Sequence, residues 1–330
     1  MENFLLLEND AIQLNTGVFA GVDAYSRYPA GELLGVRLRE PNMLVTHVGE
    51  LVPAYTETMR RKSKFSVEFH KNGMVKAVAL NEQTEIETPI GEFPAELVTF
   101  YDTGELHRFF PLDGKISGFW SEEEERALGI PFSFDLGFTR FTAILSGVCF
   151  CKSGDIRSVT LFPGETAEVE TRYGVITARH GFSLYESGAL QSVEPNEPTV
   201  IQTPIGAVTA FDTEAVGVSA DENSLAFDER GRVTALITVH SKVAVQTGAG
   251  ELRLFSPTAA VHPLDDDAEF TKGIKISFDY AENAVTLTSG GETGVFSLAD
   301  CNFHIESAEP AAFGCSPSDC AGCSGNCGAG

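Results

Sequence analysis

Two stretches of this chain match each other without a gap, and they decide its fold. The first is FHKNGMVKAVALNEQTEIETPIG, from Phe69 to Gly91, and the second is LYESGALQSVEPNEPTVIQTPIG, from Leu184 to Gly206. Both have a glycine as their fifth residue, and both end in Thr-Pro-Ile-Gly. Self-similarity of this kind is the signature of a repeat architecture. The chain is therefore predicted to consist of repeated structural units.

Two further pairs of segments repeat in the same order. Residues 28–38 match residues 151–161, and residues 98–109 match residues 225–236. Three units of the first half thus return in the second half, which indicates a duplication. Each of the six units is centred on one glycine: Gly31, Gly73, Gly104, Gly154, Gly188 and Gly231.

Each unit is predicted to be a β-hairpin that turns at its glycine. Apolar residues alternate before the glycine, as Val67 and Phe69 do before Gly73, so they share one face of a strand. The glycine supplies the positive φ of a tight turn. A weaker seventh unit, residues 276–287, has Asn283 at this place. A second landmark, Thr-x-x-Gly, begins at Thr46, Thr88, Thr171, Thr203 and Thr247.

One short helix is expected within residues 121–131. Ser121 and Glu124 match a capping box, and Gly129 and Pro131 supply the stop. The sequence thus predicts an all-β protein of stacked or sandwiched antiparallel hairpin sheets in two duplicated lobes, joined by this helix. The expected divisions are an N-terminal lobe (1–120), the helix or linker (121–131), a C-terminal lobe (132–306) and a flexible Cys/Gly-rich tail (307–330).

The units resemble MORN-type β-hairpin repeats of the bacterial variety. The likeness is carried by FHKNGMVKAVA at 69–79, FYDTGELHRFF at 100–110 and LYESGALQSVE at 184–194, and the units cover roughly half of the chain. MORN units recur at a nearly constant period, whereas the glycines here are 31 to 50 residues apart. The resemblance implies protein binding or scaffolding.

Composition and charge limit the classes of partner that we expect for this chain. The 330 residues carry a net charge of −24, which makes nucleic acid and membrane surfaces poor partners, so we expect a protein partner. Residues 1–8 lack a basic segment and a long apolar run, so a cytoplasmic location is expected. One basic run, Arg60-Arg61-Lys62 with Lys64, is either a local anion site or, as we favour, a solvated turn.

The usual catalytic signatures are absent from the sequence, so we expect a binding protein rather than an enzyme. An active site assembled from distant strands stays open. Glu68 and His70 could form an acid–base pair, but a solvated strand face is favoured. The acidic residues 265–267 are interpreted as a charged turn rather than a calcium site.

The tail carries four cysteines in a C-x4-C-x2-C-x3-C pattern: Cys315, Cys320, Cys323 and Cys327. Small, turn-forming residues separate them, so their thiolates could converge on zinc or an iron–sulfur cluster. A redox-active or disulfide-bonded tail and a tail without a role remain alternatives.

Cys149 and Cys151 should share the strand face opposite Val148 and Phe150. They are possible extra metal ligands or a docking place for the tail; alternatively they are small apolar fillers under a covering layer, which we favour.

Two functional hypotheses follow. The first is a β-repeat scaffold or protein-interaction module with a thiol-rich tail that could bind a metal. The second is an electron-transfer or metal-handling protein that carries the iron–sulfur cluster or zinc on the tail. The edges of repeat sheets also make self-association plausible.

Overall fold

The computed structural model describes residues 3–7, 10–14, 17–61, 64–215, 217, 219–262 and 265–308. Contacts divide the chain into two compact units. Unit 1 comprises Met1–Glu194, Val216–Asn223 and Asp228–Gly231, and unit 2 comprises Pro195–Ala215, Ser224–Phe227 and Arg232–Gly330. The described residues form thirty strands and one short helix, so the predicted all-β class is confirmed.

Unit 1 contains the helix and the first eighteen strands. They are β1 (Leu5–Leu7), β2 (Ala11–Leu14), β3 (Gly17–Phe19), β4 (Val22–Arg27), β5 (Leu33–Leu38), β6 (Leu44–Thr46), β7 (Gly49–Leu51), β8 (Val67–Phe69), β9 (Val75–Thr88), β10 (Gly91–Phe100), β11 (Leu106–Phe110), α1 (Glu122–Arg126), β12 (Phe132–Asp135), β13 (Arg140–Ala143), β14 (Leu145–Phe150), β15 (Ile156–Leu161), β16 (Thr166–Thr171), β17 (Gly174–Leu184) and β18 (Leu190–Pro195).

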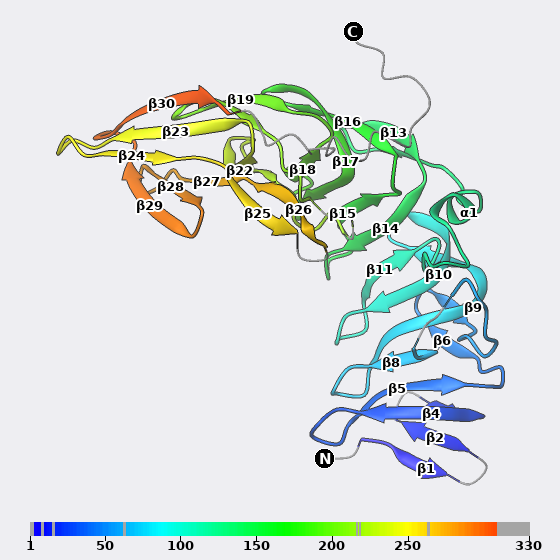
Figure 1. The fold of residues 1–330 in the computed structure, drawn as a ribbon. Helices are drawn as coiled ribbons and strands as arrows, with labels where there is room; N and C mark the ends of the chain where they lie inside the picture. Colours follow the sequence, from blue (N-terminus) through cyan, green and yellow to red (C-terminus); the bar gives the residue numbers. More distant parts are fainter. Residues whose placement is uncertain are drawn as a thin grey trace, which may run out of the picture. The chain divides into compact units, whose positions relative to one another are not determined.

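The main sheet of unit 1 is built from the glycine-centred hairpins. Its strands lie in the order β4-β5-β8-β9-β10-β11-β14-β15-β17-β18, with β16 also paired to β17. Figure 1 shows β4, β5, β8 and β9 following one another in this order. Neighbouring strands in space are mostly neighbours in sequence, as a chain of linked hairpins requires.

The six glycine turns share one geometry. In each, the glycine N–H donates to the carbonyl three residues earlier, at 2.8–3.0 Å. All six glycines have φ between 71° and 104°, where a residue with a Cβ is strained. In the main sheet, the hairpins that turn at Gly31, Gly73, Gly104 and Gly154 share one irregularity. The pairing register of their two strands shifts by one residue just before the turn, as in a bulge next to a type I turn. The hairpins predicted from the repeats are thus confirmed.

The predicted apolar face is a continuous ladder across the main sheet. Directly opposed pairs run from Tyr25 and Val36 at β4 and β5 to Val159 and Phe182 at β15 and β17. The residues of this ladder between its ends are fully buried: Val36, Val67, Val78, Val98, Phe109, Val148 and Val159. Burial of each such side chain stabilises the fold by roughly 1.5–3 kcal/mol.

The Thr-x-x-Gly landmarks are a second kind of hairpin turn. At Thr46, Thr88, Thr171 and Thr203 the hydroxyl donates to the carbonyl of the glycine three residues later, at 2.7–2.9 Å. Thr247 differs, because there the N–H of Gly250 donates to the Thr247 carbonyl, as in the first kind of turn.

Aromatic contacts hold a second layer against the apolar face of unit 1. The ring centroid of Phe93, near the start of β10, lies 5.1 Å from that of Phe109 in β11. Phe141 of β13 meets Phe182 edge-on at 5.8 Å. The core of unit 1 therefore lies between its main sheet and the smaller hairpins.

Adjacent hairpins are also linked by side chains at the turns. The Tyr28 hydroxyl donates to the Phe69 carbonyl at 2.9 Å, and the Tyr101 hydroxyl donates to the Phe150 carbonyl at 2.8 Å. His70 makes the equivalent bond to the Phe100 carbonyl at 2.9 Å. His70 is thus a structural link between hairpins rather than part of a solvated face, while Glu68 pairs with Lys76 at 3.2 Å.

Helix α1 has the capping box expected from the sequence. Ser121 accepts from the Glu124 N–H, and the Glu124 side chain accepts from the Ser121 N–H. Strands β11 and β14, which come before and after the stretch that contains α1, β12 and β13, pair directly with each other. Residues 121–131 therefore form an excursion within unit 1, and the division between the compact units falls later, at Glu194 and Pro195.

Unit 2 contains twelve strands. They are β19 (Thr199–Thr203), β20 (Gly206–Ala210), β21 (Leu225–Phe227), β22 (Val233–Thr238), β23 (Ser241–Gln246), β24 (Leu252–Phe255), β25 (Thr258–His262), β26 (Asp265–Lys272), β27 (Ile274–Asp279), β28 (Ala284–Ser289), β29 (Glu292–Ser297) and β30 (Asn302–Ser307).

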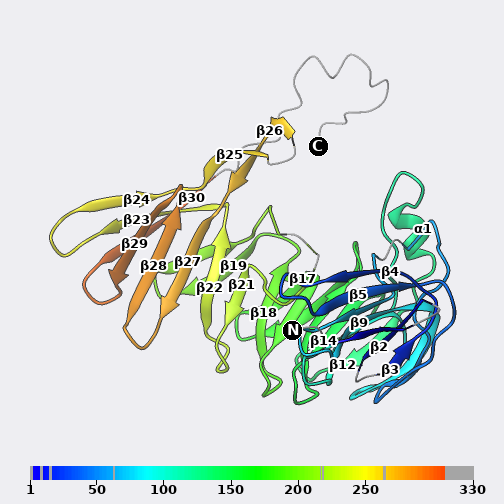
Figure 2. The same cartoon turned by 90° about the horizontal axis from the view of Figure 1, so that it is seen from below.

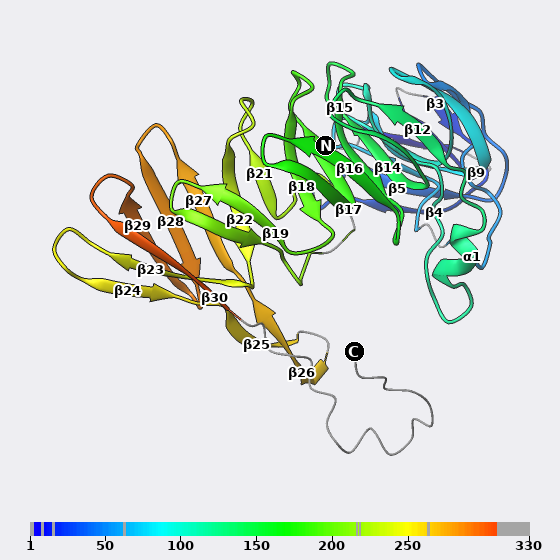
Figure 3. The ribbon, with the colours of Figure 1, turned by 90° about the horizontal axis from the view of Figure 1, so that it is seen from above.

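The strands of unit 2 form one larger sheet and three small ones. β21, β22, β27, β28 and β29 are neighbours in that order, and β27, β28 and β29 run side by side in Figure 2. Figure 3 shows the separate group β24-β23-β30. The weaker seventh unit is the hairpin of β27 and β28, where Asn283 takes the positive φ (49°) that glycine has elsewhere. Among the described residues, no helix has the length and apolar character needed to cross a membrane.

Candidate functional site

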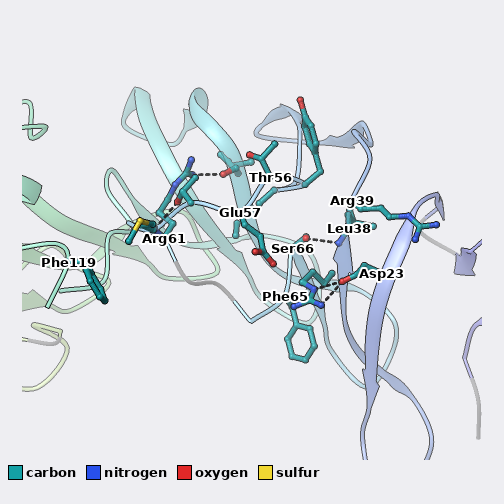
Figure 4. A pocket seen from close by; sticks show the side chains of 16 residues that line it. Asp23, Leu38, Arg39, Thr56, Glu57, Arg61, Phe65, Ser66 and Phe119 are labelled. Atoms are coloured by element: carbon teal, nitrogen blue, oxygen red, sulfur yellow. Dashed lines mark hydrogen bonds and ion pairs between the residues drawn. The ribbon is translucent and has the colours of Figure 1, made fainter. Parts of the chain in front are cut away.

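Unit 1 contains a groove of about 900 Å³. Strands β4, β5 and β9 supply one part of its lining, and the irregular stretches 54–61 and 64–66, together called the irregular segment, supply most of the rest. Figure 4 shows Arg61 and Phe119 toward one end of the groove and Arg39 at the other. A volume of this size suits a drug-sized ligand or a short stretch of polypeptide.

Two arginines line the groove: Arg37, which lies in β5, and Arg39, which follows β5 directly. Arg37 donates to Asp23 of β4 at 2.7 Å, and Arg39 pairs with Asp10 at 2.5 Å. The side chains of Arg37 and Arg39 are 47% and 53% exposed. Ion pairs with this exposure contribute roughly 0–1 kcal/mol, so they form and break easily. Both guanidinium groups are therefore accessible to another carboxylate.

Arg61 occupies a more fixed position in the same lining. Its two terminal nitrogens donate to the Leu80 carbonyl at 2.5 Å and the Asn81 carbonyl at 2.6 Å. The Asn81 side chain accepts from the Thr56 N–H at 3.2 Å and from the Thr56 hydroxyl at 2.8 Å. These bonds attach the irregular segment to β9 and so shape one wall of the groove.

Arg60, the residue before Arg61, belongs to a buried network of charged side chains instead. It donates to Glu96 at 2.7 and 2.8 Å and to Glu125 at 2.7 and 2.9 Å. The side chains of Arg60, Glu96 and Glu125 are only 14%, 8% and 4% exposed. Burial alone lowers the pKa of Arg60, but the bonds to Glu96 and Glu125 raise it overall. The favoured solvated turn at Arg60 and Arg61 is therefore wrong, because partners distant in sequence bind both side chains.

Apolar side chains complete the groove. The Phe65 ring packs against β5 at Gly35, where an added Cβ would come within 2.7 Å of it. Met59 and Phe119 also line the cavity and are 65% and 72% exposed. Large side chains so exposed around a concave surface are typical of binding sites. The groove thus combines guanidinium groups with uncovered apolar surface.

The two strand cysteines lie on the polar face of the main sheet. Cys149 is opposite Arg108 on one side and Ser158 on the other. Burial raises the pKa of Tyr101, and the nearby Cys149 and Cys151 both add to the rise, which agrees with the two thiols sharing this face.

A segment distant in sequence covers this face at Cys149. Asp221 accepts from Arg108 at 2.5–2.6 Å and from the Ser158 hydroxyl at 2.5 Å. The Ala220 N–H donates to the Thr160 hydroxyl at 3.1 Å. Cys149 is consequently only 1% exposed. Burial raises the pKa of both thiols, which disfavours the thiolate that a metal requires.

The predicted tail ligands Cys315, Cys320, Cys323 and Cys327 lie outside the described residues, as do the side chains of residues 265–267. Within the described part of the chain, no group of three or more His, Cys, Asp or Glu side chains could hold a metal ion. Cys301 is half-buried just before β30 and remains unassigned.

The described lining of the groove contains arginine, carboxylate, hydroxyl and aromatic groups, and no histidine or cysteine. Guanidinium forks bind carboxylates in a bidentate manner, so this chemistry suits recognition. Sequence analysis singled out only Arg61 of this set. The two arginines at positions 37 and 39, on one face of a strand, were a weak signal, but nothing in the sequence places Phe119 beside them.

Comparison of the chain with protein-family models, with curated proteins and with solved structures finds no match.

Proposed function

We propose that the protein is a β-repeat interaction module, and that the groove of unit 1 binds a segment of a partner protein. The segment carries carboxylate side chains next to an apolar residue. The observation that supports this proposal is the joint presence of accessible arginines and exposed apolar side chains in one concavity of a chain with net charge −24. The MORN-type likeness of the hairpins agrees with it.

The arginines favour a carboxylate as the polar part of the partner. Asp23 and Asp10 already show that a carboxylate fits Arg37 and Arg39 at 2.5–2.7 Å. Because both pairs are about half exposed, their mutual stabilisation is small, and an incoming carboxylate can replace either one. Met59 and Phe119 then receive the apolar residue, whose burial supplies most of the affinity.

A protein segment fits the electrostatics better than nucleic acid does. The chain as a whole repels a polyanion, whose binding depends on many phosphate contacts. The groove lining has three arginines, of which Arg37 and Arg39 already pair with Asp23 and Asp10, so positive charge is available only locally, at these guanidinium groups. A short segment with one or two carboxylates interacts mainly with this local charge.

Selection of peptides on the intact protein tests the proposal. Peptides retrieved from a random display library should contain Asp or Glu beside an aromatic or aliphatic residue. A labelled peptide of this kind should bind in an anisotropy titration, and the double variant Arg37→Glu/Arg39→Glu should weaken it at least about tenfold.

The matched control is Arg140→Glu. Arg140 also forms an exposed arginine–aspartate pair, with Asp135, but β13 does not line the groove. Binding that is equally sensitive to Arg140→Glu, or that ignores the groove variants, would overturn the proposal. Failure to retrieve any acidic peptide would do the same.

A further inference from the structure

The first strand of unit 1 consists of three exposed leucines. β1 (Leu5–Leu7) is the outer strand of the small sheet β1-β2-β3. Leu5, Leu6 and Leu7 are 63%, 56% and 41% exposed. Figure 1 shows β1 as the strand beyond β2 near the N-terminus. No described strand pairs with its other edge.

The exposed surface includes both faces of this strand. Leu6 is opposite Ile12, which is opposite Phe19, and the latter two are 1% and 3% exposed. Leu6 thus continues the apolar row of Phe19 and Ile12, but unlike these two residues it is exposed. On the other face, Leu5 is opposite Gln13, and Gln13 is opposite Val18, which is 56% exposed.

The sequence of β1 is typical of a strand in the interior of a sheet, although β1 lies at an edge. Continuous apolar residues are typical of strands that are covered on both faces. Soluble proteins protect free edges with charged residues, proline or bulges. β1 contains none of these, and its pairing with β2 is regular along its length. By contrast, the outer strand β24 of unit 2 has Arg253 between Leu252 and Leu254.

We propose that β1 is a self-association edge, where two copies of the chain pair antiparallel about a two-fold axis at Leu6. In this arrangement Leu6 faces its own counterpart, and Leu5 faces Leu7 of the second copy. The unpaired N–H and carbonyl groups of each edge then satisfy each other, and leucines of both copies come together on both faces.

A second copy fits this surface better than a different partner. The strand is self-complementary under a two-fold axis, and β1 has no charged side chain that would select an oppositely charged protein. The patch is small beside the roughly 800 Å² per partner of a standard interface, so the dimer forms reversibly with concentration. Because each copy carries a charge of −24, salt should strengthen the dimer by screening the repulsion.

Sedimentation equilibrium on the full-length chain, with the tail thiols kept reduced, tests the proposal. Mass should rise from monomer toward dimer between about 1 and 200 µM, and further in high salt. Leu6→Lys places a charge at the two-fold axis and should weaken the dimer at least about tenfold. Leu254→Lys is the matched control, since Leu254 is 59% exposed on the outer strand β24.

Each outcome decides the matter. A monomer at every concentration, or a dimer that Leu6→Lys leaves intact, overturns the proposal. A dimer lost in Leu6→Lys, with circular dichroism unchanged and with Leu254→Lys still dimeric, supports it. Peptide binding in the groove is measured separately and involves none of these leucines, so the two proposals can fail independently.

Discussion

Replacing Arg60 by methionine removes the guanidinium group that binds both buried carboxylates, and it keeps a side chain of similar length. Glu96 and Glu125 then lose four hydrogen bonds of 2.7–2.9 Å. With side chains 8% and 4% exposed, neither carboxylate can recover its hydration. Removing one partner of a buried ion pair typically costs about 3–5 kcal/mol, because the charge left behind is uncompensated.

The remaining donors keep the cost within this range. Glu96 still accepts from the Asp113 N–H at 2.7 Å, and Glu125 still accepts from the Gly114 N–H at 2.8 Å and from Trp120 at 2.7 Å. We therefore expect Arg60→Met to lower the unfolding free energy of unit 1 by about 3–4 kcal/mol at neutral pH. Adding Glu96→Gln to this variant should restore part of the loss, because it removes one uncompensated charge.

Urea denaturation followed by tryptophan fluorescence measures this loss. Trp120 is the only tryptophan, and it donates to Glu125, so its emission reports on this part of unit 1. Arg140→Met is the control, since Arg140 is 81% exposed and pairs with the exposed Asp135. Its cost should be below about 1 kcal/mol. Equal losses in Arg60→Met and Arg140→Met, or a further loss on adding Glu96→Gln, would refute the reasoning.

Three further predictions concern other parts of the chain. Tyr101→Phe removes the bond to the Phe150 carbonyl and should cost about 0.5–1.5 kcal/mol in urea denaturation; no loss would show that this link between hairpins adds nothing. Burial lowers the pKa of His107, so its contribution to stability is present above about pH 6.5 and is lost as the pH falls; His107→Gln should flatten the decline in stability between about pH 7 and 5, and an unchanged slope would contradict this. For the tail, we expect stoichiometric zinc or iron by elemental analysis of protein purified without oxygen, lost when residues 315, 320, 323 and 327 are all serine; metal-free protein with freely titrating tail thiols would exclude the metal site.

The features that were predictable from the sequence depend on short-range rules. A glycine such as Gly104, with alternating apolar residues on each side, specifies a hairpin. The tight turn needs a residue with a positive φ, which is 104° at Gly104, and glycine adopts such an angle without strain. The capping box of Ser121 and Glu124 likewise lies within one turn of a helix. Even the fully buried ladder residues follow from the two-residue period of a strand.

The groove was not predictable, because its residues come from segments that meet only through the stacking of hairpins. Arg37, Arg61 and Phe119 belong to β5, to the irregular segment and to the loop before α1. No local pattern determines which of these segments approach each other. The basic run was therefore interpreted from its charge alone, and the burial of Arg60 was missed.

The amino-acid sequence by itself determined the repeated hairpins, their apolar face and the capped helix, since each depends on neighbouring residues and a fixed backbone period. Only the tertiary structure decided how chemically similar residues differ in environment. Arg60 enters a buried network while Arg61 lines a groove, and Cys149 is covered by a segment centred on Asp221. Leu6 is exposed at an edge while Ile12, its partner in the next strand, is buried. The physical reason is that burial and charge pairing depend on which distant segments come into contact, and a local pattern of residues does not contain that information.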